Sequence, residues 1–140
     1  MKKVLLAIDL AHQEGWDASI EHAVMLSRTL GAELHVLTVI PDYGMAIVGS
    51  YFPKDYSETA IKETEAALDT FIAEHFPQEV APVPHVRHGT IYKEITGVAD
   101  HLGVDMIVMA SHRPEMKDYL LGPNAARVVR HARQSVTVIR

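Results

Sequence analysis

The chain of 140 residues contains no cysteine. This absence excludes a disulfide framework, a thiolate metal site and a cysteine nucleophile. Nine histidines are present, but no two of them stand in the H-E-x-x-H motif of zinc enzymes. We therefore expect most of the histidines to be structural or exposed to solvent, and we expect no metal site built from protein side chains alone.

Long apolar runs are also missing, since none approaches the roughly 20 residues that a membrane-spanning helix needs. The opening stretch MKKVLLAIDL is a poor signal peptide, because Asp9 ends its apolar run and no small-residue cleavage site follows. Basic residues are the minority, with 13 Lys and Arg against 18 Asp and Glu and a net charge of −5. Binding to duplex nucleic acid usually needs a broad basic face. We therefore expect a cytoplasmic protein that binds neither a membrane nor nucleic acid.

What the chain does have is a regular alternation of short apolar runs and amphipathic segments, within a length that suits one domain. The predicted strands cover residues 3–9, 33–40, 83–89, 104–110 and 135–139, and the predicted helices cover residues 16–31, 57–76, 90–103 and 123–132. Such alternation predicts an α/β fold, in which parallel strands are joined by right-handed crossovers and helices cover both faces of an open sheet.

Polar and small residues follow the predicted strands at the points where they end. In open α/β sheets, ligands bind beyond the carboxyl ends of the strands, where the strand order reverses. The start of the last helix offers backbone N–H groups, which favour anions, and glycine lets a phosphate approach closely. The residues that we assign to this site are Ala7, Ile8, Asp9, Thr38, Val39, Ile40, Pro41, Gly89, Met109, Ser111, His112, Arg113, Gly122, Pro123, Asn124 and Ala125.

The chemistry of these residues predicts a nucleotide as the ligand. The carboxylate of Asp9 can accept a hydrogen bond from a ribose hydroxyl, and a flat base fits near Val39 and Ile40. Phosphates fit between the segments Ser111–Arg113 and Gly122–Asn124. The chain has neither the G-x-G-x-x-G signature nor a Walker loop, so it is not assigned to the dinucleotide-binding or P-loop folds.

The whole chain, residues 1–140, resembles the universal stress protein (UspA-like) family. The resemblance is carried by VLLAIDL, GAELHVLTVIP, GTIYKEITGVADHLGVDMIVMAS and, most of all, SHRPEMKDYLLGPNAARVVRHARQSVTVIR. The last stretch is similar to a branch of the family marked by a Ser-His-Arg-Pro run. The resemblance implies one domain with a five-stranded parallel sheet in the order 3-2-1-4-5, like that of the adenine nucleotide alpha hydrolases. It also implies a dimer and, in many members, bound ATP at the site assigned above.

The chain departs from the motif of the nucleotide-binding members, which is Gly-x-x-Gly, nine residues, then Gly and Ser or Thr. Here Ala110 and Arg113 stand at the two glycine positions, the spacer 114–121 has eight residues, and Pro123 replaces the hydroxyl residue. Arg113 can favour a phosphate or block it, and Pro123 removes both a hydroxyl and an N–H. Asn124 and Ser111 are candidates to compensate.

We nevertheless expect ATP as the ligand, with ADP or AMP as alternatives. Asp9 could hold a Mg²⁺ ion that bridges the phosphates. No nucleophile, base and orienting group can be assembled, since Ser111 beside His112 does not provide triad geometry. We expect a regulator of stress or energy status with little or no catalysis. The alternatives are a protein-interaction module that binds no nucleotide, and a slow ATPase.

The final strand contains four residues of mostly apolar character, Val136, Thr137, Val138 and Ile139. An exposed apolar edge tends to pair with another chain, and the family resemblance implies that this strand forms a homodimer. The alternative is a covered edge within a monomer. A further protein partner is expected, but the sequence does not identify it.

Overall fold

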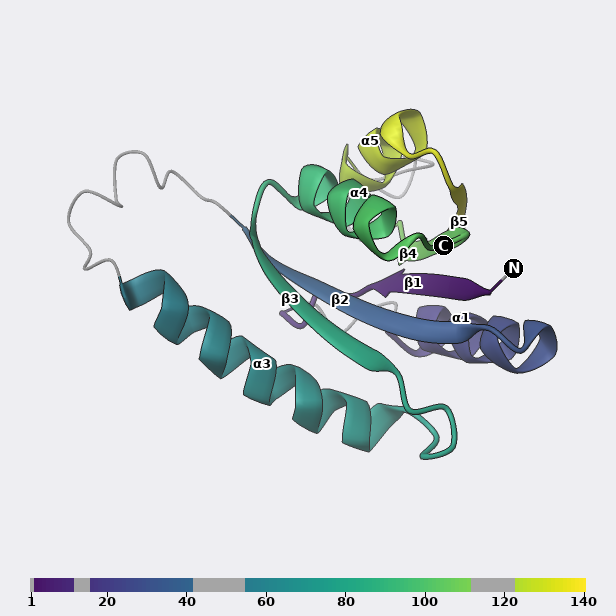
Figure 1. Ribbon diagram of the computed structural model, residues 1–140, viewed down its shortest axis with the longest axis horizontal. Coiled ribbons are helices and arrows are strands. Elements are labelled where there is room, and N and C mark those ends of the chain that lie inside the picture. Colours follow the sequence, from purple (N-terminus) through teal and green to yellow (C-terminus); the bar gives the residue numbers. More distant parts are fainter. Residues whose placement is uncertain (1, 12–15, 42–54, 112–122) are drawn as a thin grey trace.

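A computed structural model of the protein describes residues 2–11, 16–41, 55–111 and 123–140. The strands are β1 (Lys3–Ala7), β2 (Glu33–Pro41), β3 (Val83–Gly89), β4 (Met106–Ala110) and β5 (Ser135–Ile139), and the helices are α1 (Trp16–Leu30), α3 (Asp55–His75), α4 (Ile91–Leu102) and α5 (Pro123–His131). The strands form one parallel sheet in the order β3-β2-β1-β4-β5 (Figure 1). The predicted α/β fold and strand order are confirmed.

The central strand β1 is apolar because both of its faces are covered. Val4, Leu5 and Leu6 have no exposed surface, and β1 pairs with β2 on one side and β4 on the other. Parallel strands buried on both faces have continuous apolar runs rather than an alternating pattern. The run of Val4, Leu5 and Leu6 therefore specifies the centre of the sheet.

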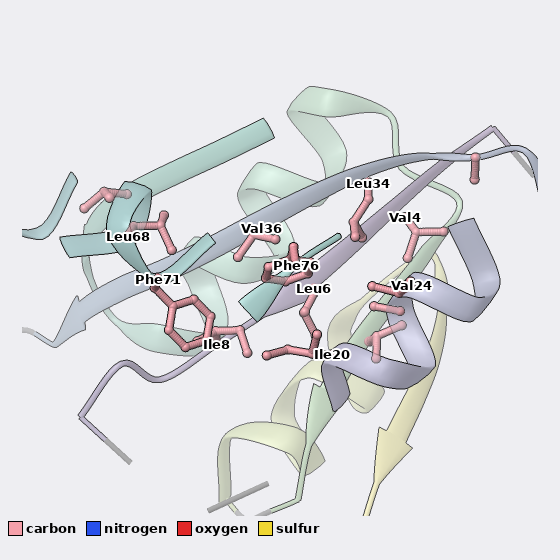
Figure 2. Packing of buried hydrophobic residues seen from close by; sticks show 14 residues of the cluster. Val4, Leu6, Ile8, Ile20, Val24, Leu34, Val36, Leu68, Phe71 and Phe76 are labelled. Carbon is pink, nitrogen blue, oxygen red and sulfur yellow. The ribbon is translucent and has the colours of Figure 1, made fainter. Parts of the chain in front are cut away.

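The sheet separates two apolar cores. The first, which we call the α1–α3 core, joins Leu6 of β1 to Ile20 of α1 and to Leu68 and Phe71 of α3 (Figure 2). The second, the α4–α5 core, lies on the opposite face. Its buried residues are Leu5, Leu37, Ile95, Val98, Ala99, Val104, Ile107, Met109, Ala125 and Val128. Within the described ranges, no helix is both long and apolar enough to cross a membrane.

Several boundaries differ from the predicted ones for local reasons. β1 ends at Ala7, because Asp9 turns the chain and accepts a hydrogen bond from the N–H of Ala11. β4 begins at Met106, because the N–H of Val104 still bonds to the carbonyl of Ala99 at the end of α4. α3 begins two residues before the predicted start, at Asp55.

The two edges of the sheet are β3 and β5. Pro84 lies within β3, where its missing N–H is tolerated because an edge strand has a free side. The expected strand order 3-2-1-4-5 places residues 83–89 at an edge of the sheet, and the observed order confirms it. The other edge, β5, is a short strand whose four apolar or hydroxyl side chains are only partly buried.

Candidate functional site

The strand order reverses between β1 and β4. β1 is followed by α1, which packs in the core on one face, while β4 precedes α5, which packs in the core on the other face. At this point Ala7 lies opposite both Leu37 and Met109. Connections that leave in opposite directions open a crevice at the carboxyl edge of a parallel sheet, and ligands of such folds bind there.

Strands β2 and β3 extend beyond β1 on one side of this point (Figure 1). Leu37 is opposite the last residue of β1, but β2 continues to Pro41, which pairs with Gly89 at the end of β3. At about 3.3 Å per residue, these four residues project about 13 Å past Ala7. The main chain of residues 38–41 therefore forms one side of the carboxyl edge.

Successive residues of that projection point to opposite faces of the sheet. Val39 packs against the α4–α5 core, and Ile40 packs against the α1–α3 core. A planar base lying on one face would therefore contact only one of these two side chains, together with the main chain of its neighbour. Thr38 is 4% exposed, so its hydroxyl is part of the protein interior.

Asp9 is an exposed residue held in a defined turn. Its Oδ1 accepts a hydrogen bond from the N–H of Ala11 at 2.9 Å, and its backbone carbonyl accepts one from Nε1 of Trp16 at 2.8 Å. The indole of Trp16 packs edge-on against Phe71 of α3, with the ring centres 4.6 Å apart. The position of Asp9 is therefore set by α1 and α3. The sequence analysis did not identify Trp16, and the available signal was a large aromatic at the first residue of the helix.

Some of the predicted site residues have buried side chains. Ile8, Met109 and Ala125 are 7%, 5% and 2% exposed, so they offer a ligand only main-chain atoms. Met109, Ala125 and the partly buried Ala7 and Val39 belong to the same α4–α5 core. This core therefore brings the ends of β1, β2 and β4 together with the first turn of α5.

Helix α5 begins at Pro123, as predicted. The first N–H groups of a helix have no partner within it and carry a partial positive charge. Proline contributes no N–H, so the donors of this turn start at Asn124, whose side chain is partly exposed. Ser111 follows β4, and its own N–H donates to the carbonyl of Ile139 at 2.8 Å, which holds this residue beside the end of β5.

Gly89 ends β3 with a φ of +149°, which residues with a side chain rarely adopt. A Cβ atom at this position would lie 3.1 Å from Oε2 of Glu94 in α4. Gly89 therefore allows the first turn of α4 to approach the strand closely. The sequence analysis assigned Gly89 to the site but did not identify Glu94, which adds an acidic group to this edge.

Three residues assigned to the site, His112, Arg113 and Gly122, lie outside the described residues. Among the residues that the structure does describe, no three His, Asp or Glu side chains are grouped closely enough to hold a metal ion. Asp9 is an exposed carboxylate at this edge.

A hollow of about 570 Å³ lies elsewhere, between α1 and the end of α3. Its lining residues are Asp17, Ile20, Glu21, Val24, Met25, Arg28, Thr29, His75 and Pro77. None of them is a residue that the sequence predicts for the ligand. We take the carboxyl edge as the candidate site, because it has the helix start and the strand reversal that the hollow lacks.

Comparison with known proteins agrees with this architecture. The model of the universal stress protein family matches residues 1–140. Universal stress protein G of Shigella flexneri is 33% identical over 144 residues, with 99% of each chain covered. Among solved structures, universal stress protein UspA from Lactobacillus plantarum superposes with a TM-score of 0.70 at 22% identity, covering 99% of this chain and 97% of that one.

A further solved structure has the same fold, a universal stress protein in complex with cAMP, with a TM-score of 0.61 at 17% identity. It covers 99% of this chain and 96% of that one. The family model and the full-length relative, taken together with the strand order, show that this chain belongs to the universal stress protein family.

Proposed function

We propose that this protein binds ATP or ADP at the carboxyl edge of its sheet and acts as a dimeric regulator of stress or energy status, with little or no catalysis. The observation that carries the proposal is the reversal of strand order between β1 and β4. Asp9 follows β1 by two residues, Ser111 follows β4 directly, and α5 is the helix that comes after β4 in the chain. A family member in complex with cAMP supports an adenine nucleotide as the ligand.

The donors and acceptors at this edge fit a nucleotide. Asp9 is exposed and acidic, so it can accept a hydrogen bond from a ribose hydroxyl. The N–H groups of Asn124 and Ala125 can donate to phosphate oxygens at the start of α5. When Mg²⁺ accompanies the phosphates, Asp9 is the residue that would hold it, since carboxylate oxygen is a preferred ligand.

The first prediction concerns nucleotide binding. ATP and ADP at millimolar concentration should raise the melting temperature, because a ligand at 100 times its Kd stabilises the native state by about 2.7 kcal/mol. In Asp9→Asn, the amide oxygen can still accept the N–H of Ala11, but the charged acceptor is lost. We expect nucleotide affinity to fall about tenfold, as for loss of a charged hydrogen bond. Arg113→Ala should also change the affinity.

Asp17→Asn is the matched control, since Asp17 is an exposed acid on α1 and its removal should leave nucleotide affinity unchanged. The melting temperature would be measured by thermal shift with ATP, ADP, AMP and cAMP, and phosphate release would be followed for hours. A melting temperature that none of these nucleotides moves would contradict the proposal.

That result would favour the second candidate function, a protein-interaction module without a nucleotide. The specific observation on its side is that α5 starts with proline, which removes one of the N–H donors from the helix start. Steady phosphate release in the same assay would instead indicate a slow ATPase.

The dimer is proposed to form through the open edge of β5. Arg127 and His131 face α4, because both contact the ring of Tyr92 at 5.4 and 5.3 Å. Val128 is fully buried, and each residue advances about 100° round a helix. Val129 therefore faces away from α4, toward the β5 side, where it is 45% exposed. Together with the edge of β5 it forms an apolar surface suited to a second copy of the chain.

The second prediction tests this dimer. Wild-type protein should sediment at about 31 kDa, twice the chain mass of 15.5 kDa. Val129→Glu should raise the dimer dissociation constant at least tenfold, because it places a charge in an apolar contact. Met25→Glu is the control, since Met25 is similarly exposed, at 49%, but lies on α1. A wild-type monomer, or equal dissociation of both variants, would contradict the proposal.

A further inference from the structure

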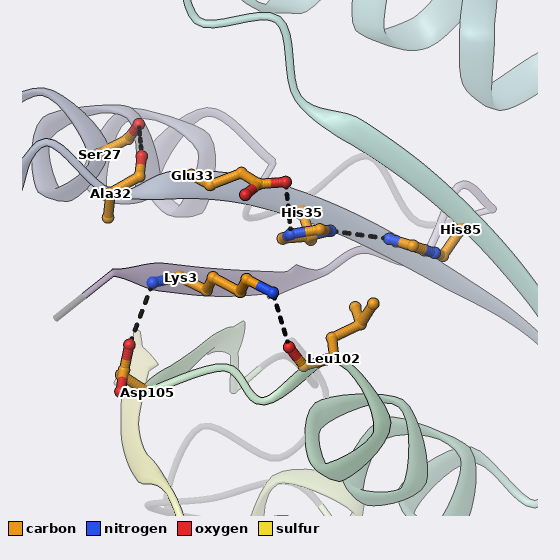
Figure 3. A network of polar contacts seen from close by, with 8 residues as sticks. All are labelled: Lys3, Ser27, Ala32, Glu33, His35, His85, Leu102 and Asp105. Atoms are coloured by element: carbon orange, nitrogen blue, oxygen red, sulfur yellow. Dashed lines mark hydrogen bonds and ion pairs between the residues drawn. The ribbon is translucent and has the colours of Figure 1, made fainter.

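Two histidines from neighbouring strands contact each other on the face that α4 covers (Figure 3). His35 of β2 lies opposite Val83 of β3, and His85 is two residues further along the same face. Nδ1 of His35 is 2.9 Å from Nε2 of His85, and the rings are stacked with centres 5.1 Å apart. His35 is 4% exposed, whereas His85 is partly buried. The hydrogen bond therefore ties β2 to β3 from within the fold.

The charge of Glu33 determines how the hydrogen bond is arranged. Its Oε1 lies 3.2 Å from Nε2 of His35, close enough for electrostatic attraction although not aligned as a hydrogen bond. The carboxylate favours a proton on that nitrogen, which leaves Nδ1 of His35 as an acceptor. Nε2 of His85 is then the donor. The hydrogen bond between the two rings therefore forms when both imidazoles are neutral.

Added protons disturb this arrangement. An imidazolium donates from both nitrogens, so two protonated rings would bring two N–H groups and two positive charges face to face at 2.9 Å. Lys3 of β1, whose Nζ donates to the carbonyl of Leu102 at 3.0 Å, and Arg87 of β3 add positive charge nearby. Glu33 is the one acid that opposes them among the groups that shift the two histidines.

Helix α4 supplies no compensating charge to this face. Its buried residues are Ile95, Val98 and Ala99, whereas its charged residues Lys93, Asp100 and His101 are exposed and Glu94 lies against Gly89. Burial is the main reason why the pKa of His35 is lowered, with Lys3 adding to the effect and Glu33 opposing it. Burial also lowers the pKa of His85, followed by the charges of His35 and Arg87.

We propose that His35 and His85 form a proton-sensitive latch that fastens the edge strand β3 to β2, and that protonation below neutral pH releases the strand. A single side-chain hydrogen bond can contribute noticeably to the stability of β3, because this strand pairs on a single side and has a proline within it. β3 also carries Gly89 to the carboxyl edge. Release of the latch would therefore loosen one side of the candidate site in acid.

The direction of the pH effect follows from the two lowered pKa values. Histidine in the unfolded chain has a pKa of about 6.5, so the open form binds protons at a higher pH than the closed pair does. The closed form is then fully stable above that pH and loses stability as the pH falls below it.

The third prediction is a local loss of protection in β3. Hydrogen exchange, corrected for the intrinsic effect of pH, would be measured on the full chain at pH 7.5 and 5.5. Protection of β3 amides should fall about tenfold relative to β1, as for loss of one hydrogen bond between neutral groups. His85→Gln keeps a polar amide that cannot titrate and leaves only His35 to take up a proton, so the protection of β3 relative to β1 should fall less than in wild type. His101→Gln removes an exposed histidine of α4 and should behave as wild type.

The latch would be overturned if the protection of β3 relative to β1 did not change with pH in wild type. It would also be overturned if this protection fell equally in His85→Gln, or if all strands lost protection equally. Nitrogen-15 NMR of the imidazole rings in wild-type protein provides a second test, which does not depend on how a substitution affects folding. We expect two coupled titrations displaced to acid pH, with a proton on Nε2 of both rings at pH 7.5. Two independent titrations at the ordinary value would also overturn it.

Discussion

Replacing Leu6 by alanine should lower the free energy of unfolding by about 3 kcal/mol, within the range found for buried leucines. Leu6 has no exposed surface and lies on β1 in the α1–α3 core. Its neighbour Leu5 is equally buried but belongs to the α4–α5 core, so Leu5→Ala should cost a similar amount. A domain of this size is stable by only about 5–15 kcal/mol, so either change removes a large part of the total.

Urea unfolding at neutral pH, followed by circular dichroism, measures both effects. Leu30→Ala is the control, because Leu30 is 42% exposed at the end of α1 and its truncation should cost less than 1 kcal/mol. If Leu6→Ala and Leu30→Ala shift the midpoint equally, β1 does not lie between two packed layers. A large loss for one of the two strand leucines but not for the other would indicate that only one face of the sheet is tightly packed.

Replacing Gly89 by alanine should lower the free energy of unfolding by about 2 kcal/mol. The φ of +149° is strained for alanine, and the new Cβ would lie 3.1 Å from Oε2 of Glu94. Because Gly89 ends β3 beside Pro41, the strain is placed at the candidate site, and we expect nucleotide affinity to fall as well. Thermal unfolding and a nucleotide titration measure the two effects.

Gly97→Ala is a control that should change the free energy of unfolding in the opposite direction. Gly97 lies within α4, and nothing lies within 4 Å of the position its Cβ would occupy. Alanine favours a helix interior by about 1 kcal/mol over glycine, so this variant should be more stable than wild type. Adding Glu94→Ala to Gly89→Ala separates the crowding from the backbone strain, because only the crowding is relieved. If Gly89→Ala left the free energy of unfolding unchanged, β3 would be able to end in another conformation.

The predicted fold is confirmed to the level of strand order, and the reason is physical. Each buried strand must be apolar on both faces, so runs such as residues 3–9 stand out from the amphipathic helices between them. Strand ends were less well predicted, because they depend on single hydrogen bonds. The turn at Asp9 and the bond from Val104 to Ala99 are examples.

The residues that lie near the carboxyl edge could be predicted from the sequence, whereas their burial and contacts could not, and binding of a ligand there stays a prediction. Strand ends identify which residues reach the carboxyl edge, yet not which way each side chain points, so the burial of Met109 and Ala125 was not predicted. Contacts between distant segments were also missed. His35 and His85 are 50 residues apart and meet only through the register of β2 and β3, which no local pattern of the sequence specifies.

The placement of Trp16 determines what an optical experiment on this protein reports. It is the chain's one tryptophan, and it packs against Phe71 and His75 on the α1–α3 side of the sheet. Tyr92, on the other side, stacks on His131. Emission excited at the red edge of the indole band therefore follows only one layer, while tyrosine absorbance has a contribution from the other. A difference between the two signals would reveal layers that come apart in separate steps.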